Sequence, residues 1–568
     1  MEYNEDMSQY RFRFANLSIF TIISFLIGTL ILIRELLLIN VKNYPFDDGL
    51  FIGRAESLIG DTEKTLGSTR GFNPLVKGQV YPFVLNFCNL LGLNPLVLVY
   101  CIFLATAILI LILINKENRS LLFISSFIIF VFLDPSPFSA QASRIGREFL
   151  YEIIVMLSFA LLIKLKFRFS DQKFRQRPPL VIATGSSIGL LMFLANNTRE
   201  ERPWIYLIWV TGFIWLIGKN RKTVLPIIFI VATTIIAYIV FNSYLRIYNE
   251  NIFGVKLTST TIEGEFPRLM SNLSSTNVKE KLNPYVSISE PKRQIAYKNS
   301  PSFSLLKNYL EGDGKAWIQF GCENSQTCED YANGWFHVAL RVAIDKQGFW
   351  ISQKNAQDFM RKINIELEQA CISGKMLCGK ALPIAKALGV TMITKSQLAT
   401  SIDFLKVYID KSLFGWNRGT QEHDAFTVME EKQWERWVFV VKSLPDSQVQ
   451  YQNQYNNRIS IFNPIYQKWI SFYVAISLLG ILSFLFVVYQ LIFNRNRFGS
   501  GEKLLLSIAF YSLFIWFTRG SLLAINSSTN FISVFENYAL PGRVFLPVAL
   551  SIFFYLGVKI VLEAKNEK

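Results

Sequence analysis

Long, nearly uncharged blocks of apolar residues are the feature that most limits what this 568-residue chain can fold into. The hydrocarbon core of a bilayer is about 30 Å thick, so a helix that crosses it needs roughly 20 mostly apolar residues. About ten blocks approach that length, and the third, fourth and sixth are short. The predicted spans are 15–40, 95–115, 120–134, 148–164, 178–197, 203–218, 224–245, 467–493, 504–525 and 542–562. These blocks predict an all-α polytopic membrane protein.

Basic residues give the predicted membrane protein two distinct sides. If the N-terminus is cytoplasmic, the inner segments carry 18 Lys and Arg residues, whereas the short outer segments carry 9 although they are longer in total. Cytoplasmic loops are enriched in Lys and Arg. We therefore expect a multi-pass protein of the inner (plasma) membrane with both termini in the cytoplasm. The first block is too long and lacks a small-residue cleavage site, so we expect an anchor and not a removable signal peptide.

One long hydrophilic segment, 246–466, separates a membrane module at 1–245 from another at 467–568, and the predicted orientation places it outside. Within 353–373 the apolar residues recur every three or four positions, and Gly374 follows as a helix C-cap. Similar patterns occur at 335–346, 396–413 and 428–443. The segment therefore predicts a mostly helical extracytoplasmic domain.

Four of the six cysteines fall in this predicted outer domain. An oxidising compartment allows such cysteines to pair, and their spacing is poor for a zinc site. We expect two local disulfides, although four cysteines allow three connectivities. The candidates are Cys322, Cys328, Cys371 and Cys378.

The first predicted outer loop, 41–94, contains the adjacent carboxylates Asp47 and Asp48. At the membrane surface such a pair can act as general base for a sugar hydroxyl, or as oxygen ligands for a divalent metal such as Mg²⁺ or Mn²⁺. The alternative is that Asp48 caps the helix that follows. Lys77, near the end of the same loop, is a candidate phosphate ligand, or else an interfacial lysine that reaches the headgroups.

Mixed-charge clusters occupy two further predicted outer positions. Arg144, Arg147 and Glu148 precede the fourth span, and Arg199, Glu200 and Glu201 precede the sixth. Ion pairs between loop ends would explain each cluster alone. Because both clusters lie on the predicted face of Asp47 and Asp48, a shared site is the more informative hypothesis.

Arg519 lies deep within the ninth predicted span. A guanidinium in the membrane is costly unless it faces a polar group or a phosphate, so it marks a candidate functional site. Arg543, at the outer end of the last span, is a candidate to join it, although reaching to the headgroups would also explain its position.

Several other function classes lack sequence support. The basic residues sit at span ends, so the net charge of +16 does not indicate nucleic-acid binding. There is no P-loop, dinucleotide fingerprint or G-x-S-x-G motif in the sequence, and the two histidines, His337 and His423, have no spacing typical of metal ligands.

The order of these motifs resembles the GT-C superfamily of membrane glycosyltransferases, in particular a large bacterial branch. The matching elements are Asp47-Asp48-Gly49-Leu50, Lys77-Gly78 with Tyr81-Pro82, Arg144-Ile145 with Arg147-Glu148 and Tyr151, and Thr198-Arg199-Glu200-Glu201 with Trp204. The resemblance is best over 30–210. One difference is Thr65-Leu66-Gly67, which stands where that branch carries a tryptophan-bearing turn.

The resemblance implies a GT-C-like fold and transfer of a sugar from a polyprenyl-phosphate donor to a cell-envelope glycan, lipid or protein at the outer face. Asp47 or Asp48 would take the acceptor proton. From the positions of the charges we expect the phosphate ligands to be Lys77, Arg147, Arg199, Arg519 and Arg543. The residues expected to bind the sugar or to orient these cations are Tyr81, Glu148, Glu200 and Glu201.

Two hypotheses of other classes remain open. A transporter or flippase of a lipid-linked or anionic solute usually shows paired repeats, broken spans and charges at the membrane midplane. Here seven predicted spans precede the outer domain and three follow, without visible symmetry. A non-catalytic envelope assembly protein would instead depend on 246–466 as its docking surface.

Overall fold

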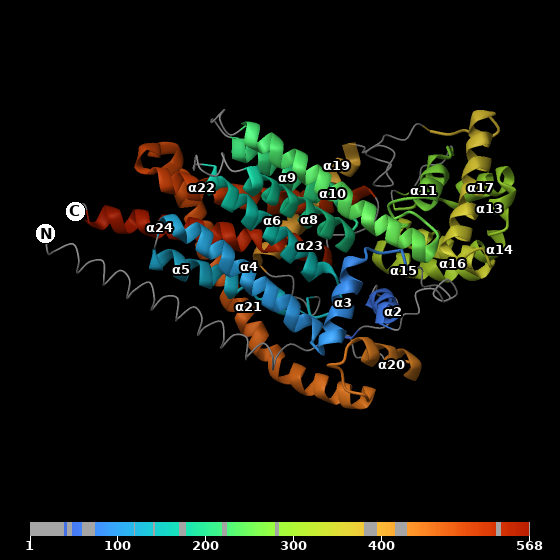
Figure 1. Cartoon of the computed structure of the whole chain (residues 1–568), viewed down its shortest axis with the longest axis horizontal. Coiled ribbons are helices and arrows are strands. Elements are labelled where there is room, and N and C mark those ends of the chain that lie inside the picture. Colours follow the sequence, from blue (N-terminus) through green and yellow to red (C-terminus); the bar gives the residue numbers. More distant parts are fainter. Residues whose placement is uncertain are drawn as a thin grey trace.

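The computed structural model is helical throughout the residues that it describes. These are 39–41, 48–59, 74–118, 120–139, 142–169, 178–217, 224–278, 283, 285–325, 327–379, 395–414, 429–529 and 536–566. Over these ranges there is no sheet, and two isolated bridges join Asn40 to Arg144 and Thr276 to Cys378. The membrane helices lie along the long axis, with a domain of short helices at one end (Figure 1).

Within the described ranges, six helices are long and apolar enough to cross a membrane, as expected of a multi-pass protein. Their apolar stretches are Pro95–Lys116, Pro178–Thr198, Val224–Phe253, Asn463–Phe493, Ser500–Thr529 and Tyr538–Lys565. They belong to α4 (Pro95–Asn118), α8 (Pro178–Thr198), α10 (Val224–Phe253), α21 (Gln448–Phe493), α22 (Ser500–Thr529), and α23 (Glu536–Arg543) with α24 (Phe545–Asn566). All six coincide with predicted spans. The predicted span 15–40 lies outside the described residues except for 39–40.

The three other predicted spans are also helical but differ from these six. The span 148–164 is α6 (Glu148–Arg168), which carries charges at both ends and is buried along most of its length. The span 203–218 is the shorter α9 (Arg202–Ile217). The span 120–134 consists of α5 (Leu121–Phe127) followed by the π-helix η2 (Ile128–Phe132).

Aromatic side chains of α21 satisfy the carbonyl groups that η2 and the following turn leave available. The Tyr473 hydroxyl donates to the Phe130 carbonyl at 2.6 Å, and the Trp469 indole N–H donates to the Leu133 carbonyl at 2.8 Å. Tyr466 donates to the Pro135 carbonyl at 3.1 Å. A non-helical backbone is tolerated at membrane depth where neighbouring groups satisfy it in this way.

Close contact between α8 and α10 depends on two glycines. A Cβ atom at Gly185 would lie 1.8 Å from the Thr233 Oγ1 atom, and one at Gly189 would lie 2.6 Å from the Thr234 carbonyl oxygen. Small residues let membrane helices approach until their backbones touch. The backbones of α8 and α10 are therefore in direct contact at these two positions.

The helical domain, residues 258–379, has a hydrophobic core separate from that of the membrane helices. Its elements are α11 (Glu265–Ser275), α12 (Glu290–Asn299), α13 (Pro301–Ser304), α14 (Lys307–Leu310), η5 (Asp313–Lys315), α15 (Ala316–Ser325), α16 (Asn333–Lys346) and α17 (Gln353–Ile372). The helix predicted from the amphipathic pattern at 353–373 is confirmed as α17. Ser352 caps it, and Gly374 follows it with φ of 73°. α19 (Lys395–Phe414) and α20 (Glu431–Val440) also fall within 246–466, but their buried residues join the main core.

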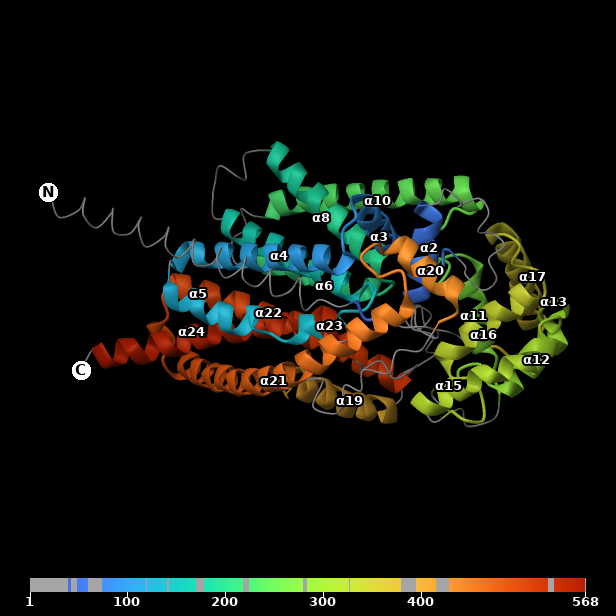
Figure 2. The same ribbon diagram turned by 90° about the horizontal axis from the view of Figure 1, so that it is seen from below.

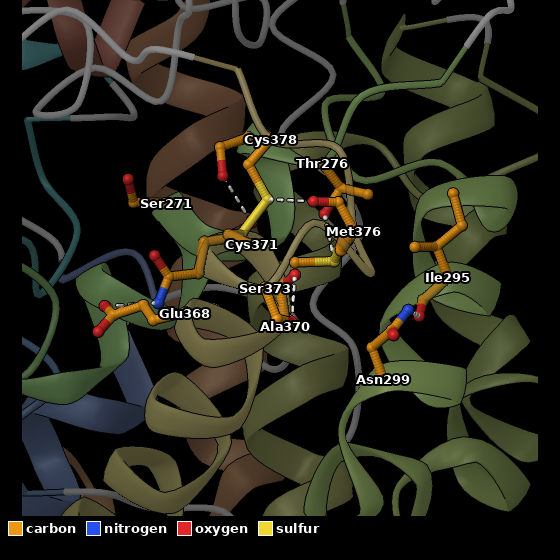
Figure 3. Close-up of a disulfide and its surroundings, with 12 residues drawn as sticks. Ser271, Thr276, Ile295, Asn299, Glu368, Ala370, Cys371, Ser373, Met376 and Cys378 are labelled. Carbon is orange, nitrogen blue, oxygen red and sulfur yellow. Dashed lines mark hydrogen bonds between the residues drawn. A yellow bond between two sulfur atoms is a disulfide. The ribbon is translucent and has the colours of Figure 1, made fainter.

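Both predicted disulfides are present, as the local pairs Cys322–Cys328 and Cys371–Cys378. Figure 3 shows the second pair at the end of α17, beside Thr276 at the end of α11. The Asn277 amide donates to the Leu377 carbonyl, and the Gly379 amide donates to the Ser275 carbonyl, both at 2.8 Å. The disulfide therefore lies where the C-terminal ends of the two helices are joined.

Two further helices pack against α2 (Asp48–Ile59), which begins at the second residue of the acidic pair. α3 (Val80–Leu91) and α20 both pack against it, and Figure 2 shows this group between the membrane helices and the helical domain. The short segment 39–41 is held by Tyr451 of α21, whose hydroxyl donates to the Ile39 carbonyl at 2.7 Å and accepts from the Val41 amide at 3.1 Å.

Candidate functional site

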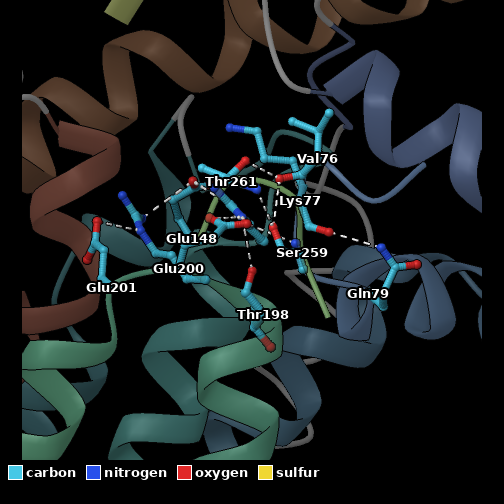
Figure 4. Close-up of polar contacts among 12 residues, drawn as sticks. Val76, Lys77, Gln79, Glu148, Thr198, Glu200, Glu201, Ser259 and Thr261 are labelled. Atoms are coloured by element: carbon cyan, nitrogen blue, oxygen red, sulfur yellow. Dashed lines mark hydrogen bonds and ion pairs between the residues drawn. The ribbon is translucent and has the colours of Figure 1, made fainter. Parts of the chain in front are cut away.

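Charged side chains from distant parts of the sequence meet where the membrane bundle faces the helical domain. They come from the loop before α3, the start of α6 and the turn between α8 and α9 (Figure 4), and from α22. We call this group the charged site: it consists of Lys77, Arg147, Glu148, Arg199, Glu200, Glu201 and Arg519. Ion pairs link its members on α6, the α8–α9 turn and α22, and the charge of Lys77 acts on Glu200.

Asp48 lies beside the charged site and forms an ion pair with Arg144. It is the first residue of α2 and only 1% exposed, and both of its carboxylate oxygens accept from the Arg144 guanidinium, one of them from Nε at 3.2 Å. Arg144 is itself held by a backbone bridge to Asn40. This pair therefore fixes the start of α2 against the segment before α6. Asp47 lies outside the described residues.

Arg147 and Glu200 form the part of the site nearest the loop of Lys77. The Arg147 Nη1 atom lies 2.6 and 2.8 Å from the two Glu200 carboxylate oxygens and also donates to the Thr198 carbonyl at 3.2 Å. The Gly78 amide donates to the same carboxylate at 2.9 Å. Burial alone would raise the pKa of Glu200, but the positive charges of Arg147 and Lys77 hold it below its usual value. The loop is thus tied to the α8–α9 turn through Glu200.

Glu201 joins two arginines at the other end of the site. One carboxylate oxygen accepts from Arg199 Nε at 2.7 Å, and the other accepts from Arg519 Nη1. Burial would raise the pKa of Glu201, yet Arg199 and Arg519 together lower it to about 2. Glu201 is therefore ionised throughout the physiological pH range.

The two guanidinium groups bound to Glu201 are almost fully buried and lie against aromatic rings. Arg199 stacks on Tyr538 at 4.7 Å, and Arg519 stacks on Trp204 at 4.9 Å and donates to the Tyr538 carbonyl. Among the residues that the structure describes, buried Arg199 Nη2 has no hydrogen-bond partner. A buried donor without an acceptor is costly, so this atom keeps a donor capacity that the described side chains do not use.

Glu148 is the least tightly held carboxylate of the charged site. Its Oε1 atom lies 3.4 Å from Arg199 Nη1 and 4.0 Å from Arg147 Nε, and its side chain is 19% exposed. Tyr81, which the sequence proposes as a residue that binds the sugar or orients the cations, is buried, and its ring centre lies 5.3 Å from that of Phe51. The charges of Asp48 and Glu148 act on its hydroxyl. The structure thus places Tyr81 beside both carboxylates.

Comparison of the chain with protein-family models, with curated proteins and with solved structures found no match. The chemistry of the charged site is therefore argued from its own residues. Within the described ranges, no three His, Cys, Asp or Glu side chains gather as metal ligands would, and Asp48 already uses both oxygens on Arg144.

Arg543 belongs to a second group of buried charges, which the sequence analysis missed. Its charge and that of Asp134 act on Glu152, one turn after Glu148 in α6. Asp134 accepts from the amide and the hydroxyl of Ser136, at 3.0 and 2.6 Å, whereas Glu152 Oε2 has no hydrogen-bond partner in the described part of the chain. An isolated carboxylate within an apolar block was the available signal for Glu152.

Proposed function

We propose that the chain is a membrane glycosyltransferase that moves a sugar from a polyprenyl-phosphate donor to a cell-envelope acceptor on the outer face. The charged site carries this proposal, because three arginines and Lys77 lie there among three glutamates, where the membrane bundle faces the helical domain. A lipid-linked phosphate combines an apolar chain in the bilayer with an anion at its surface. The disulfides support an outer location for the helical domain, since they form in oxidising compartments.

The phosphate would bind between Lys77, Arg199 and Arg519. A phosphate oxygen would give the buried Arg199 Nη2 atom the acceptor that it lacks, and charge-assisted hydrogen bonds of this kind are roughly twice as strong as neutral ones. Arg147, which is bound to Glu200 by both carboxylate oxygens, would orient the Lys77 loop and contact the phosphate less directly. The charge of Arg543 acts on Glu152, so we assign it no phosphate contact.

Glu148 is the described carboxylate best placed to take the acceptor proton. It is partly exposed and loosely held, whereas Glu200, Glu201 and Asp48 each make close ion pairs. Asp47 stays a candidate for the same role from the sequence. Asp48 would act by positioning α2, because both of its oxygens are taken by Arg144.

The reaction would be an in-line displacement at the anomeric carbon of the donor. The acceptor hydroxyl oxygen forms a bond to that carbon, its proton passes to the Glu148 or Asp47 carboxylate, and the bond between the carbon and the phosphate oxygen breaks. The electron pair of this bond stays on the departing phosphate. Preorganised cations that face developing charge lower such barriers most effectively, which is the part we assign to Lys77, Arg199 and Arg519.

A transfer assay with single-residue variants tests the proposal. Purified protein in liposomes is given a polyprenyl-phosphate sugar labelled in the sugar, with envelope membranes as the acceptor source, and the label that leaves the lipid is measured. We expect Glu148→Gln or Asp47→Asn to lower transfer at least about 100-fold at unchanged expression, as loss of a general base does. Asp358→Asn, which changes an exposed carboxylate of α17, is the matched control. Full transfer by the double variant Glu148→Gln/Asp47→Asn would remove both carboxylates from the mechanism, and a wild-type chain that releases no label contradicts the proposal.

A transporter of a lipid-linked or anionic solute is the second candidate, and one observation favours it. Glu152 and Arg543 are buried ionisable residues within the bundle, and ionisable residues inside a membrane mark solute and ion pathways. Movement of the labelled lipid across the same liposomes without any acceptor, reduced by Glu152→Gln but not by Glu148→Gln, would favour transport over transfer.

A further inference from the structure

A two-sided contact joins the helical domain to the loop that carries Lys77. The Thr260 amide donates to the Leu75 carbonyl at 2.7 Å, and the Thr261 hydroxyl donates to the Val76 carbonyl at 2.5 Å. Ser259 donates to the same Val76 carbonyl at 3.0 Å. Figure 4 shows Ser259 and Thr261 directly beside Val76 and Lys77. Residues 259–261 therefore hold the backbone just before Lys77.

Arg341 of α16 holds the threonine hydroxyls from the other side. Its Nη1 atom donates to Thr260 Oγ1 at 3.0 Å, and its Nη2 atom donates to Thr261 Oγ1 at 3.3 Å. The Thr260 hydroxyl also donates to the Leu75 carbonyl at 3.3 Å. Each of the two hydroxyls thus accepts from the guanidinium and donates to a carbonyl of the loop. The guanidinium fixes the direction in which both hydroxyls donate.

The Arg341 guanidinium is buried against aromatic rings and carries a charge. Its guanidinium lies 3.8 Å from the centre of the Phe266 ring and 5.8 Å from that of Trp350, and the residue is buried. Burial lowers the pKa of Arg341 to about 9 and the charge of Glu200 opposes this shift, so the group is protonated at neutral pH. The same Glu200 binds Arg147 and the Gly78 amide.

On its other side the loop has no freedom to move toward the membrane helices. A Cβ atom at Gly78 would lie 2.1 Å from the Asn197 carbonyl oxygen, so the loop backbone touches the last turn of α8. The loop is therefore enclosed between the α8–α9 turn and residues 259–261. Its geometry depends on both neighbours.

We propose that Arg341 is a positioning residue through which the helical domain sets the conformation of the Lys77 loop, by orienting the hydroxyls of Thr260 and Thr261. The effect of this coupling on phosphate binding rests on the proposed function, but the coupling itself does not. A lysine at this position has one ammonium group and no planar fork, and so cannot hold two hydroxyls in fixed directions as a guanidinium does.

Hydrogen exchange on the full chain in lipid nanodiscs tests the coupling without any substrate. The Gly78 and Thr260 amides report on the two sides of the loop. We expect Arg341→Met to raise their exchange rates about tenfold or more, and Arg341→Lys to raise them less. Arg361→Met is the control: it removes an arginine of the same domain that is 52% exposed and pairs with Glu265 and Asp358, and it should leave both amides unchanged.

A second variant keeps the test informative if Arg341→Met unfolds the domain, which faster exchange along α17 would reveal. Thr260→Val/Thr261→Val removes the two hydroxyls and leaves Arg341 in place, and it should raise exchange at Gly78 by a similar factor. Wild-type exchange at Gly78 in this double variant overturns the proposal. Binding of undecaprenyl phosphate, measured in parallel, should weaken about tenfold in the variants whose loop exchanges faster. Faster exchange with no measurable binding by the wild-type chain contradicts the phosphate site and leaves the coupling supported.

Discussion

Arg519 of α22 and Glu201, 318 residues earlier in the chain, form an ion pair that joins the C-terminal helices to the α8–α9 turn. We expect Arg519→Ala to lower the free energy of unfolding by roughly 3 kcal/mol, because it leaves the Glu201 carboxylate with one buried cation in place of two. Thermal unfolding in detergent measures the change. The double variant Arg519→Met/Glu201→Gln should recover part of the stability, since position 201 then carries no charge and Arg199 keeps its ion pair with Glu148. A stability equal to wild type in Arg519→Ala would show that this pair does not hold the helices together.

Substitution of Gly78 tests the close contact between the Lys77 loop and α8. In Gly78→Ala the new methyl group would meet the Asn197 carbonyl, a backbone atom that cannot rotate away. We expect a loss of roughly 1–3 kcal/mol in unfolding free energy, which is typical of overpacking, and weaker binding of undecaprenyl phosphate in a flotation assay. Gly334→Ala is the matched control, because no atom lies within 4 Å of its added Cβ. Equal binding by the two variants would contradict the role of the loop.

The disulfide between Cys371 and Cys378 should stabilise the junction of α11 and α17. The two cysteines are 7 residues apart, and closing so short a loop removes about 2 kcal/mol of chain entropy from the unfolded state. Cys371→Ser/Cys378→Ser is expected to lower the free energy of unfolding of the helical domain by that amount, seen as faster hydrogen exchange at the ends of both helices. Cys88→Ser changes a buried free thiol of α3 and should leave this domain unaffected. No change in the double serine variant would argue against a stabilising role.

Lys292 should make the helical domain more stable as the pH rises through the alkaline range. Burial lowers the pKa of Lys292 to about 8, although its ammonium donates to the carbonyls of Ser274 and Ser287 at 2.6 and 2.8 Å. Between pH 8 and the usual lysine value of 10.5, the unfolded chain binds more protons than the folded one, so stability increases with pH. Compared with Lys292→Gln, the wild-type domain should gain roughly 3 kcal/mol between pH 7.5 and 10.5. Parallel pH profiles for the two proteins would contradict the assignment.

The membrane helices were predictable because the thickness of the bilayer sets the length of the apolar block that crosses it. An uncharged block such as 95–115 or 224–245 has few alternatives to a spanning helix. The amphipathic pattern of 353–373 and the local cysteine pairs were equally readable, because helix periodicity and short disulfide loops are properties of neighbouring residues.

The pairing of the charges was not predictable. The sequence placed Asp48 and Arg144 on one face, but their ion pair spans 96 residues and depends on how α2 meets the segment before α6. Arg341 gave no local signal, since it is one arginine in an ordinary amphipathic helix and gains its role from contact with Thr260 and Thr261. The spacing of residues along a helix says which face they share, and not which distant segment covers that face.

The continuity of α21 links the segment before the acidic pair to the membrane bundle. Tyr451, near its start, holds residues 39–41 just before the acidic pair, and Tyr473 holds the π-helix η2. These two tyrosines are 22 positions apart, or about 33 Å along a helix axis, and only Tyr473 lies within the apolar stretch Asn463–Phe493. Pro464 lies between them and lacks the amide needed to continue the hydrogen-bond ladder, so bending of α21 is expected at that point. A lipid environment that changes the tilt of this one helix would therefore shift the approach to the charged site relative to the middle of the bilayer.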